Sequence, residues 1–163
     1  AALGVEYHVI PTEIGKMVFS SQNDGSPCSL CAKLRKGALN NAVKEYGCNK
    51  VAYAHHMDDV VETMFLSMIF ESRFYCFPPV TYLDRADLTV IRPMIYVSEA
   101  EVKGFRNKYH LPVVENPCPV DGATKRQYAK DLVRQINLDH PGARQRIFRA
   151  VMEGNIPGWS KKR

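Results

Sequence analysis

Apolar residues recur at helical spacing in two long stretches of the chain. Between residues 28 and 46 they fall three or four positions apart, and Gly47 follows where a glycine often ends a helix. Residues 58–71 form the second stretch, with acidic side chains in the first turn and a largely apolar body. The pattern predicts two helices, the second buried around most of its circumference.

Shorter apolar runs predict strands. We expect strands at 6–10, 50–54 and 111–114, and two more within 80–91 around the polar sequence LDRAD. The polar residues 20–27, SSQNDGSP, are typical of a loop. Strands that alternate with helices predict an α/β fold with a mostly parallel sheet.

Ser98, with Glu101 three residues later, matches a capping box and predicts a helix to about Tyr109. Two further helices are expected over 123–136 and 141–152, in a part of the chain with a different charge. Residues 1–115 hold 12 Lys and Arg against 13 Asp and Glu, whereas residues 116–163 hold 10 against 4. We therefore predict a partial α/β nucleotide-binding domain over 1–115 and a basic helical segment over 116–163, packed on the same domain.

The composition, with 45% hydrophobic and 24% charged residues, is that of an ordinary globular protein. The longest apolar run, residues 64–70, is far shorter than the roughly 20 residues that a membrane-spanning helix needs. The first residues show no secretion signal, so we expect a cytoplasmic protein without membrane contact. Five cysteines, an odd number, point to reduced thiols, metal binding or catalysis rather than a disulfide framework.

The sequence HHMDDVVET, residues 55–63, lies between a predicted strand and a predicted helix. Ligands of open α/β sheets bind at this kind of junction. Asp58 and Glu62 share a helix face and Asp59 lies beside them, so the three carboxylates could hold a Mg²⁺ ion beside nucleotide phosphates. Acidic residues in a first turn also cap a helix and favour its dipole, and both interpretations remain open.

Cys28 and Cys31 form a C-x-x-C motif where the loop meets the first long helix, and Cys118 follows much later. A helix N-terminus favours the thiolate that binds metals. Three thiolates leave one position open on a four-coordinate centre, which suits an iron–sulfur cluster or a Zn²⁺ ion. A redox dithiol and cysteines without a function are the alternatives. Cys48 and Cys76 are predicted to be small core residues.

Arg126, Lys130 and Arg134 repeat every four residues and share one helix face, with Lys125 beside them. Such a face can neutralise RNA phosphates. It can equally be a solvated helix surface, although the excess positive charge of this segment favours nucleic acid.

Taken together, CSLCAKLRKGAL, HHMDDVVETMFLSMIF, FPPV, IRPM and ENPCP resemble the PP-loop ATPases that put sulfur into tRNA. Their order and spacing are most similar to the tRNA 2-thiocytidine synthetase branch, from about residue 3 to residue 152. The resemblance implies a Rossmann-like nucleotide-binding fold of the adenine nucleotide alpha hydrolase type. It implies an enzyme that activates a cytidine of the tRNA anticodon loop with ATP and then transfers sulfur from a [4Fe-4S] cluster.

The resemblance also implies roles for individual residues. Cys28, Cys31 and Cys118 would hold the cluster and, with Asp59, carry the catalysis. The nucleotide and Mg²⁺ end of the site would contain five side chains: His56, Asp58, Asp59, Glu62 and Arg92. The basic face formed by Lys125, Arg126, Lys130 and Arg134 would approach tRNA. Further implied partners are a sulfur donor such as a cysteine desulfurase and a second copy in a homodimer.

Two departures from the family pattern affect these expectations. Asp121 stands where the family usually has a second late cysteine, and the S-G-G-x-D-S phosphate loop is not among these 163 residues. That loop cradles ATP phosphates with backbone N–H groups. We therefore expect an N-terminally truncated PP-loop domain that is inactive alone. A non-enzymatic RNA-binding metal module is the main alternative, and a C-x-x-C redox protein is a weaker one.

Overall fold

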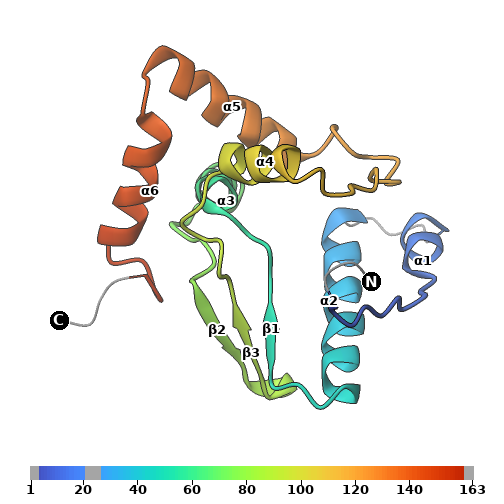
Figure 1. The fold of residues 1–163 in the computed structure, drawn as a ribbon. Coiled ribbons are helices and arrows are strands. Elements are labelled where there is room, and N and C mark those ends of the chain that lie inside the picture. Colours follow the sequence, from blue (N-terminus) through green and yellow to red (C-terminus); the bar gives the residue numbers. More distant parts are fainter. Residues whose placement is uncertain (1–3, 21–26, 160–163) are drawn as a thin grey trace. The chain divides into compact units, whose positions relative to one another are not determined.

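The computed structural model describes residues 4–20 and 27–159 (Figure 1). The chain divides into two compact units. The first, here called the amino-terminal unit, contains residues 1–51 and 83–88, and the second, the carboxyl-terminal unit, contains residues 52–82 and 89–163. The domain boundary expected between residues 115 and 116 stays a prediction.

Helix α2 (Pro27–Glu45) is the main element of the amino-terminal unit, and the shorter α1 (Ile14–Ser20) packs against it. α2 confirms the helix expected from residue 28 to residue 46. The chain leaves it through Gly47, whose φ of 68° is left-handed and whose N–H donates to the carbonyl of Lys44. Ala42 is the only buried residue of α2. Most side chains of this helix are therefore exposed or only partly buried.

The two strands expected within residues 80–91 form a hairpin. β2 (Val80–Leu83) and β3 (Leu88–Ile91) are joined by the short 3-10 helix η1 (Asp84–Ala86). This arrangement confirms the two strands expected around LDRAD. The turn is tight, so the two strands run antiparallel.

β1 (Lys50–Ala52) completes a three-stranded sheet with the order β1-β3-β2. Just beyond β1, the N–H of Tyr53 donates to the carbonyl of Ile91 at the end of β3, over 2.9 Å. The carboxyl ends of β1 and β3 therefore lie side by side and this pair is parallel, as Figure 1 also shows. The sheet is thus mixed rather than mostly parallel, because β2 returns in the opposite direction.

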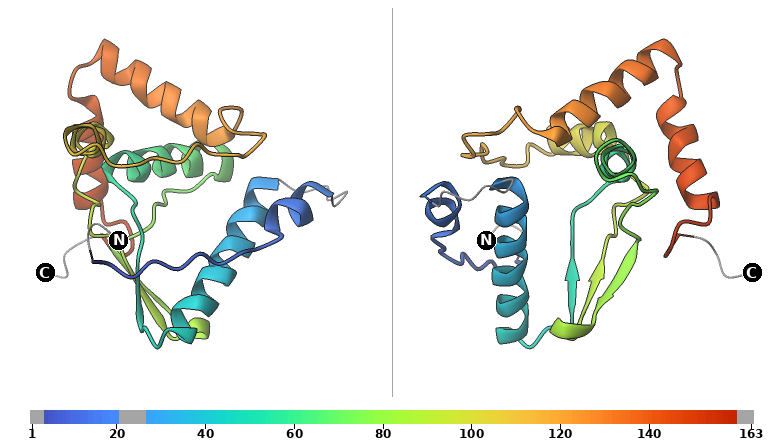
Figure 2. Two further views of the ribbon diagram at one scale, coloured as in Figure 1. Left: turned by 45° about the vertical axis from the view of Figure 1, so that its right-hand side comes forward. Right: turned by 180° about the vertical axis from the view of Figure 1, so that it is seen from behind.

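Helix α3 (Met57–Glu71) lies at the centre of the carboxyl-terminal unit. Three more helices follow in this unit: α4 (Glu99–Lys108), α5 (Lys125–Asp139) and α6 (Ala143–Glu153). α5 and α6 both pack on α3 and on each other, and Figure 2 shows α3 end-on in its right-hand view with these helices around it. All four predicted helices of this region are confirmed.

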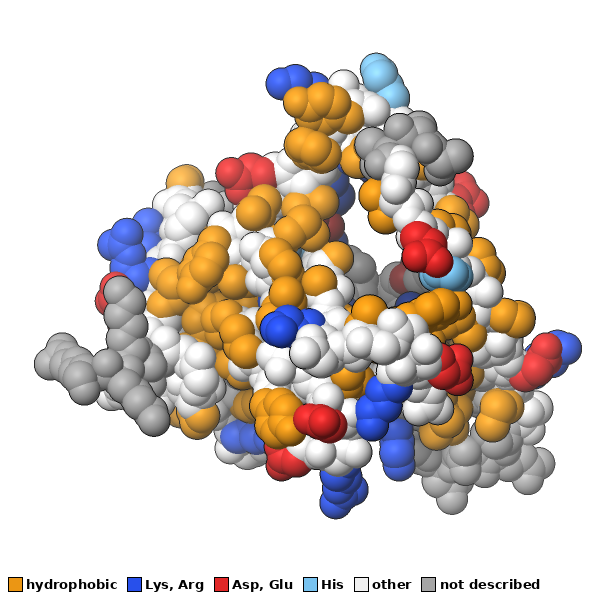
Figure 3. Space-filling view, turned by 60° about the horizontal axis from the view of Figure 1, so that its bottom comes forward, with side chains coloured by type: hydrophobic (Ala, Val, Ile, Leu, Met, Phe, Trp, Pro, Cys, Tyr) orange, Lys and Arg blue, Asp and Glu red, His pale blue; other side chains and the backbone are white. Residues whose placement is uncertain are grey.

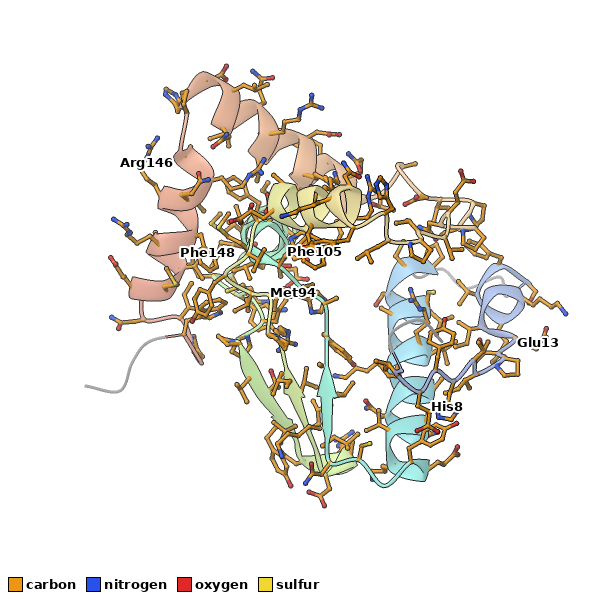
Figure 4. All side chains as sticks on the ribbon, in the orientation of Figure 1. His8, Glu13, Met94, Phe105, Arg146 and Phe148 are labelled. Atoms are coloured by element: carbon orange, nitrogen blue, oxygen red, sulfur yellow. The ribbon has the colours of Figure 1, made fainter. Side chains whose placement is uncertain are left out.

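The core of this unit is built on the apolar faces of α3 and α6. Val60 and Val61 of α3 are fully buried, and Phe148 of α6 packs against the same cluster with Trp159. The Trp159 ring meets Phe148 edge-on at 5.6 Å, and its Nε1 donates to the Phe77 carbonyl over 3.1 Å. Figure 4 shows Phe148 pointing from α6 towards α3. These contacts hold the carboxyl-terminal helices on α3.

The capping box expected at the start of α4 is present. The Ser98 hydroxyl accepts from the N–H of Glu101 over 3.2 Å, and the Glu101 carboxylate accepts from the N–H of Ser98 over 2.7 Å. Two N–H groups that the helix itself cannot satisfy are thereby paired.

Two expected strands are wrong. Residues 6–10 and 111–114 belong to no strand, and side chains there are open to solvent, with Tyr7 85% and Val114 92% exposed. A β-rich composition makes a strand only where a neighbouring strand can accept its hydrogen bonds. Conversely, α1 was not expected. Most of the loop expected over 20–27 lies outside the described residues.

Apolar side chains also remain on the surface, as Figure 3 shows for one face of the molecule. Val80 and Tyr82 of the edge strand β2 are both 59% exposed. Within residues 4–20 and 27–159, no helix is both long enough and apolar enough to cross a membrane.

Candidate functional site

The site begins where the chain leaves the parallel strands β1 and β3. Arg92, directly after β3, is held by three acceptors. Its Nε donates to His55 Nδ1 over 3.3 Å, and its Nη1 donates to the Pro78 carbonyl over 2.6 Å and to Thr81 Oγ1 over 3.1 Å. These bonds fix a guanidinium at the carboxyl edge of the sheet, which is the ligand-binding edge of α/β folds.

Aromatic rings line the same place. The Arg92 guanidinium lies 4.8 Å from the centroid of Phe77 and 5.9 Å from that of Tyr53. The ring of His55 lies 4.5 Å from Phe77. Burial lowers the pKa of His55 below its usual 6.5, so the imidazole is neutral at pH 7 and suited to accept from Arg92. A flat cation among aromatic faces can meet both a base and a phosphate.

His56 and Asp59 cap α3 reciprocally. The N–H of Asp59 donates to His56 Nδ1 over 3.3 Å, and the N–H of His56 donates to Asp59 Oδ2 over 3.0 Å. The accepting role of Nδ1 assigns the imidazole proton to Nε2. The helix-capping interpretation of this part of the motif is therefore correct for these two residues.

Asp58 connects three helices of the carboxyl-terminal unit. Its side chain is only 3% exposed. Oδ2 accepts from the N–H of Glu99, the first residue of α4, over 2.7 Å, and Oδ1 pairs with Arg144 Nη1 of α6 over 2.5 Å. Both carboxylate oxygens are thus engaged inside the fold.

Glu62, one turn further along α3, is also buried. Arg126 of α5 reaches Glu62 Oε2 over 3.4 Å and Asp59 Oδ1 over 3.3 Å with the same Nη1 atom. Burial raises the pKa of Glu62 to about 7 and outweighs the nearby Arg126 guanidinium, which acts to lower it. Near neutral pH, Arg126 therefore faces a Glu62 carboxyl group that is partly protonated.

Lys130, one turn after Arg126 on α5, pairs with Glu99. Its Nζ lies 2.7 Å from Glu99 Oε1, and Lys103 reaches the same oxygen over 3.0 Å. Burial acts to raise the pKa of Glu99, but the hydrogen bonds from Lys130 and Lys103 outweigh it and lower this pKa to about 2. A glutamate in a first helical turn is also favoured by the helix dipole.

The predicted RNA-binding face is therefore divided. Arg126 and Lys130 turn to carboxylates of α3 and α4, whereas Arg134 is exposed and Lys125 lies with its Nζ 4.7 Å from the ring of Phe70. On α6, Arg146 points away from α3 (Figure 4). Sequence spacing identified the shared face correctly but not which of its members have partners.

The predicted metal-binding cysteines lie in different units. Cys28 and Cys31 lie at the start of α2, the former exposed and the latter partly buried. Cys118 lies in the carboxyl-terminal unit and is partly buried. All are free thiols. Among the residues described, no three His, Cys, Asp or Glu side chains gather as a metal site. Cys76 is fully buried as expected, whereas Cys48 is exposed, so its core assignment is wrong.

Sequence reasoning missed two functional contacts of the acidic motif. Neither Arg144 nor Glu99 is among the site residues that the sequence pattern indicates. The available signal was the burial expected for α3, because carboxylates in a largely apolar helix need nearby cations or N–H groups. Which cation fills that need depends on long-range packing, since Arg144 lies 86 positions after Asp58.

Comparison with known proteins places this geometry in a family. Residues 6–137 match the family described as PP-loop domain. A tRNA-cytidine(32) 2-sulfurtransferase of Pseudomonas putida strain GB-1 is 37% identical over 153 residues, covering 91% of this chain and 55% of the relative. That of Geobacter sulfurreducens is 34% identical over 156 residues, covering 94% and 60%. The chain thus spans between half and two thirds of the length of these relatives.

A solved structure supports the fold. The U34-tRNA thiolase NcsA from Methanococcus maripaludis, with its [4Fe-4S] cluster, aligns with a TM-score of 0.61 at 24% identity, covering 83% of this chain and 47% of that one. The shared architecture confirms the predicted Rossmann-like α/β fold. Since the family match extends over most of the sequence, this chain belongs to the PP-loop domain family.

Proposed function

We propose that this chain belongs to the catalytic domain of an ATP-dependent tRNA sulfurtransferase that thiolates a cytidine of the anticodon loop. The observation that carries the proposal is the combination of two motifs in one PP-loop domain. A C-x-x-C pair opens α2, and HHMDDVVET bridges a parallel strand and α3. Relatives with 34–37% identity carry the name tRNA-cytidine(32) 2-sulfurtransferase.

The proposed nucleotide end of the site contains His56 and Arg92 as its hydrogen-bond donors. Arg92 uses Nε and Nη1 for its hydrogen bonds to His55, Pro78 and Thr81, and its Nη2 would donate to a phosphate or a base oxygen. His56 would offer Nε2–H. Asp58, Asp59 and Glu62 would hold the start of α3 in place through their contacts with Arg144 and Arg126. ATP, when bound, would make the cytidine O2 a leaving group by adenylation, with release of pyrophosphate.

The proposed sulfur end contains Cys28, Cys31 and Cys118. Their thiolates fit an iron–sulfur cluster chemically, since such clusters are held by cysteine sulfur. The start of α2 favours the thiolate form of Cys28 and Cys31. A [4Fe-4S] cluster held by three cysteines would supply one iron without a protein ligand, where a transferable sulfur can bind. A sulfur donor such as a cysteine desulfurase, a homodimer and a cytoplasmic location belong to the same proposal.

Mass analysis of tRNA nucleosides from a strain lacking the gene tests this function. We expect 2-thiocytidine to disappear, and the complete gene to restore it. Genes carrying Cys28→Ala or Cys118→Ala should fail to restore it, whereas Cys48→Ala, at an exposed cysteine outside the proposed ligand set, should succeed. An unchanged nucleoside profile in the deletion strain would reject the proposal.

The same gene variants separate the alternatives. A redox protein needs Cys28 and Cys31 but not Cys118. An RNA-binding module without catalysis would leave 2-thiocytidine untouched while still binding tRNA.

A further inference from the structure

The acidic residues at the start of α3 are surrounded by cations and N–H groups of the same unit. Asp58 Oδ1 pairs with Arg144, and Asp58 Oδ2 accepts a hydrogen bond from the N–H of Glu99. Asp59 Oδ1 pairs with Arg126, and Asp59 Oδ2 accepts a hydrogen bond from the N–H of His56. Together with Glu62 Oε2, which meets Arg126, five of the six carboxylate oxygens have a protein partner.

This arrangement does not fit a magnesium site. Mg²⁺ requires near-octahedral oxygen ligands and usually keeps several waters, with only one or two carboxylates from the protein. Here Asp58 is 3% exposed and Glu62 is 7% exposed at the side chain, which leaves no room for a hydrated ion at those oxygens without displacing an arginine.

The basic residues that meet these oxygens come from the two helices that close the carboxyl-terminal unit. Arg126 lies in the first turn of α5 and Arg144 in the first turn of α6. Each side chain therefore ties the beginning of its helix to the first two turns of α3. Lys130 adds a parallel tie between α5 and Glu99 at the beginning of α4.

We propose that Asp58, Asp59 and Glu62 form an internal docking site for the guanidinium groups of Arg126 and Arg144, and that this site holds α5 and α6 on α3 in place of a bound Mg²⁺ ion. The inference stands independently of tRNA thiolation, because every contact in it lies within the carboxyl-terminal unit. It also pairs Arg126 and Lys130 with carboxylates, with 47% of the Arg126 side chain still exposed, and leaves contact with RNA phosphates mainly to exposed residues such as Arg134 and Arg149.

A double-mutant cycle on the most buried pair tests the docking site. Asp58→Asn and Arg144→Met should each raise the unfolding equilibrium constant on the order of 10²-fold or more, because each leaves a buried partner uncompensated. The double variant should be far less destabilised than the product of the two effects, since no charge is left alone. Arg149→Met, the same change at an exposed position of α6, is the matched control and should leave the constant unchanged within about twofold.

Independent, multiplying effects of Asp58→Asn and Arg144→Met would overturn the proposal. So would a control variant that destabilises as strongly as Arg144→Met. Measurements on the unmutated protein keep the test decisive if a variant does not fold. Its urea midpoint should be the same in Mg²⁺ and in NaCl of equal ionic strength, because a ligand stabilises only what it binds. A Mg²⁺-dependent rise in the midpoint that is absent in Asp59→Asn would contradict the docking site.

Discussion

The amino-terminal ends of α2 and α3 carry the two chemical motifs of this chain and differ in their surroundings. At α2, Cys28 is exposed and Cys31 is partly buried, and both are free thiols. At α3, Asp58 and Glu62 are buried and engaged by arginines. The difference shows that a motif with the right residues for ligand binding can instead form its contacts within the fold. The two cysteines have free thiols that could bind a ligand, whereas the carboxylates are already paired with arginine side chains of the protein.

The packing around α3 predicts the largest effect. Phe148→Ala removes a 5% exposed ring from the cluster that includes Val60, Val61 and Trp159. We expect a loss of about 3–5 kcal/mol in the free energy of unfolding, as for other buried Phe-to-Ala changes. Urea unfolding measures it, with Leu138→Ala, 64% exposed on α5, as the control. Equal losses in the two variants would show that α6 does not form the core described here.

The buried Glu62 predicts a pH effect of intermediate size. Its folded pKa of about 7 lies above the usual 4.5, so the folded state binds more protons between these values. The stability it contributes is present below about pH 4.5 and is lost as pH rises through 7. Between pH 5 and 8 the wild type should lose about 2–3 kcal/mol relative to Glu62→Gln, which cannot ionise. If the stability difference between the wild type and Glu62→Gln did not change between pH 5 and 8, the pKa of Glu62 would not be raised by burial.

Glu99 predicts the opposite sign and a smaller size. Its pKa of about 2 lies below 4.5 because Lys130 and Lys103 outweigh the effect of burial. The stability it contributes is therefore present above pH 4.5 and lost as pH falls through 2. Glu99→Gln should cost about 1–2 kcal/mol at pH 7, the size of a hydrogen bond to a charged group, and less at pH 3. A cost that does not shrink in acid would contradict the pairing with Lys130.

The divided basic face predicts the smallest effect, on tRNA binding alone. Arg134→Ala should weaken binding and reduce the salt slope of log K by about 1, since Arg134 is exposed. Arg126→Met should change the slope less, because Arg126 is already paired with Asp59 and Glu62. Filter binding over a series of salt concentrations measures both. A larger change in slope for Arg126→Met would mean that the pairing opens when RNA binds.

Local signals in the sequence predicted much of the fold. Gly47 and the Ser98–Glu101 capping box both act within a few residues of the chain, and the structure confirms both. The strands expected at 6–10 and 111–114 failed because a strand depends on a neighbour that its own sequence does not specify. The sequence predicted a mostly parallel sheet, but only β1 and β3 are parallel, and β2 pairs with β3 in the antiparallel direction.

The candidate site was less predictable for the same reason. Spacing placed Asp58, Asp59 and Glu62 near one another, but their partners Arg126 and Arg144 lie more than 60 residues further along the chain. Residue spacing cannot distinguish carboxylates that await a metal from carboxylates that face an arginine. The cysteine assignment still rests on residue chemistry and stays a prediction.

Metal content measures the contrast between α2 and α3 most directly. The protein is reconstituted anaerobically with iron and sulfide, equilibrated with Mg²⁺, and analysed for both metals in the wild type, Cys28→Ser, Cys48→Ser and Asp59→Asn. We predict that iron is lost only in Cys28→Ser and that Asp59→Asn changes neither metal. Iron that persists in Cys28→Ser, or Mg²⁺ that the wild type retains and Asp59→Asn loses, would contradict the account.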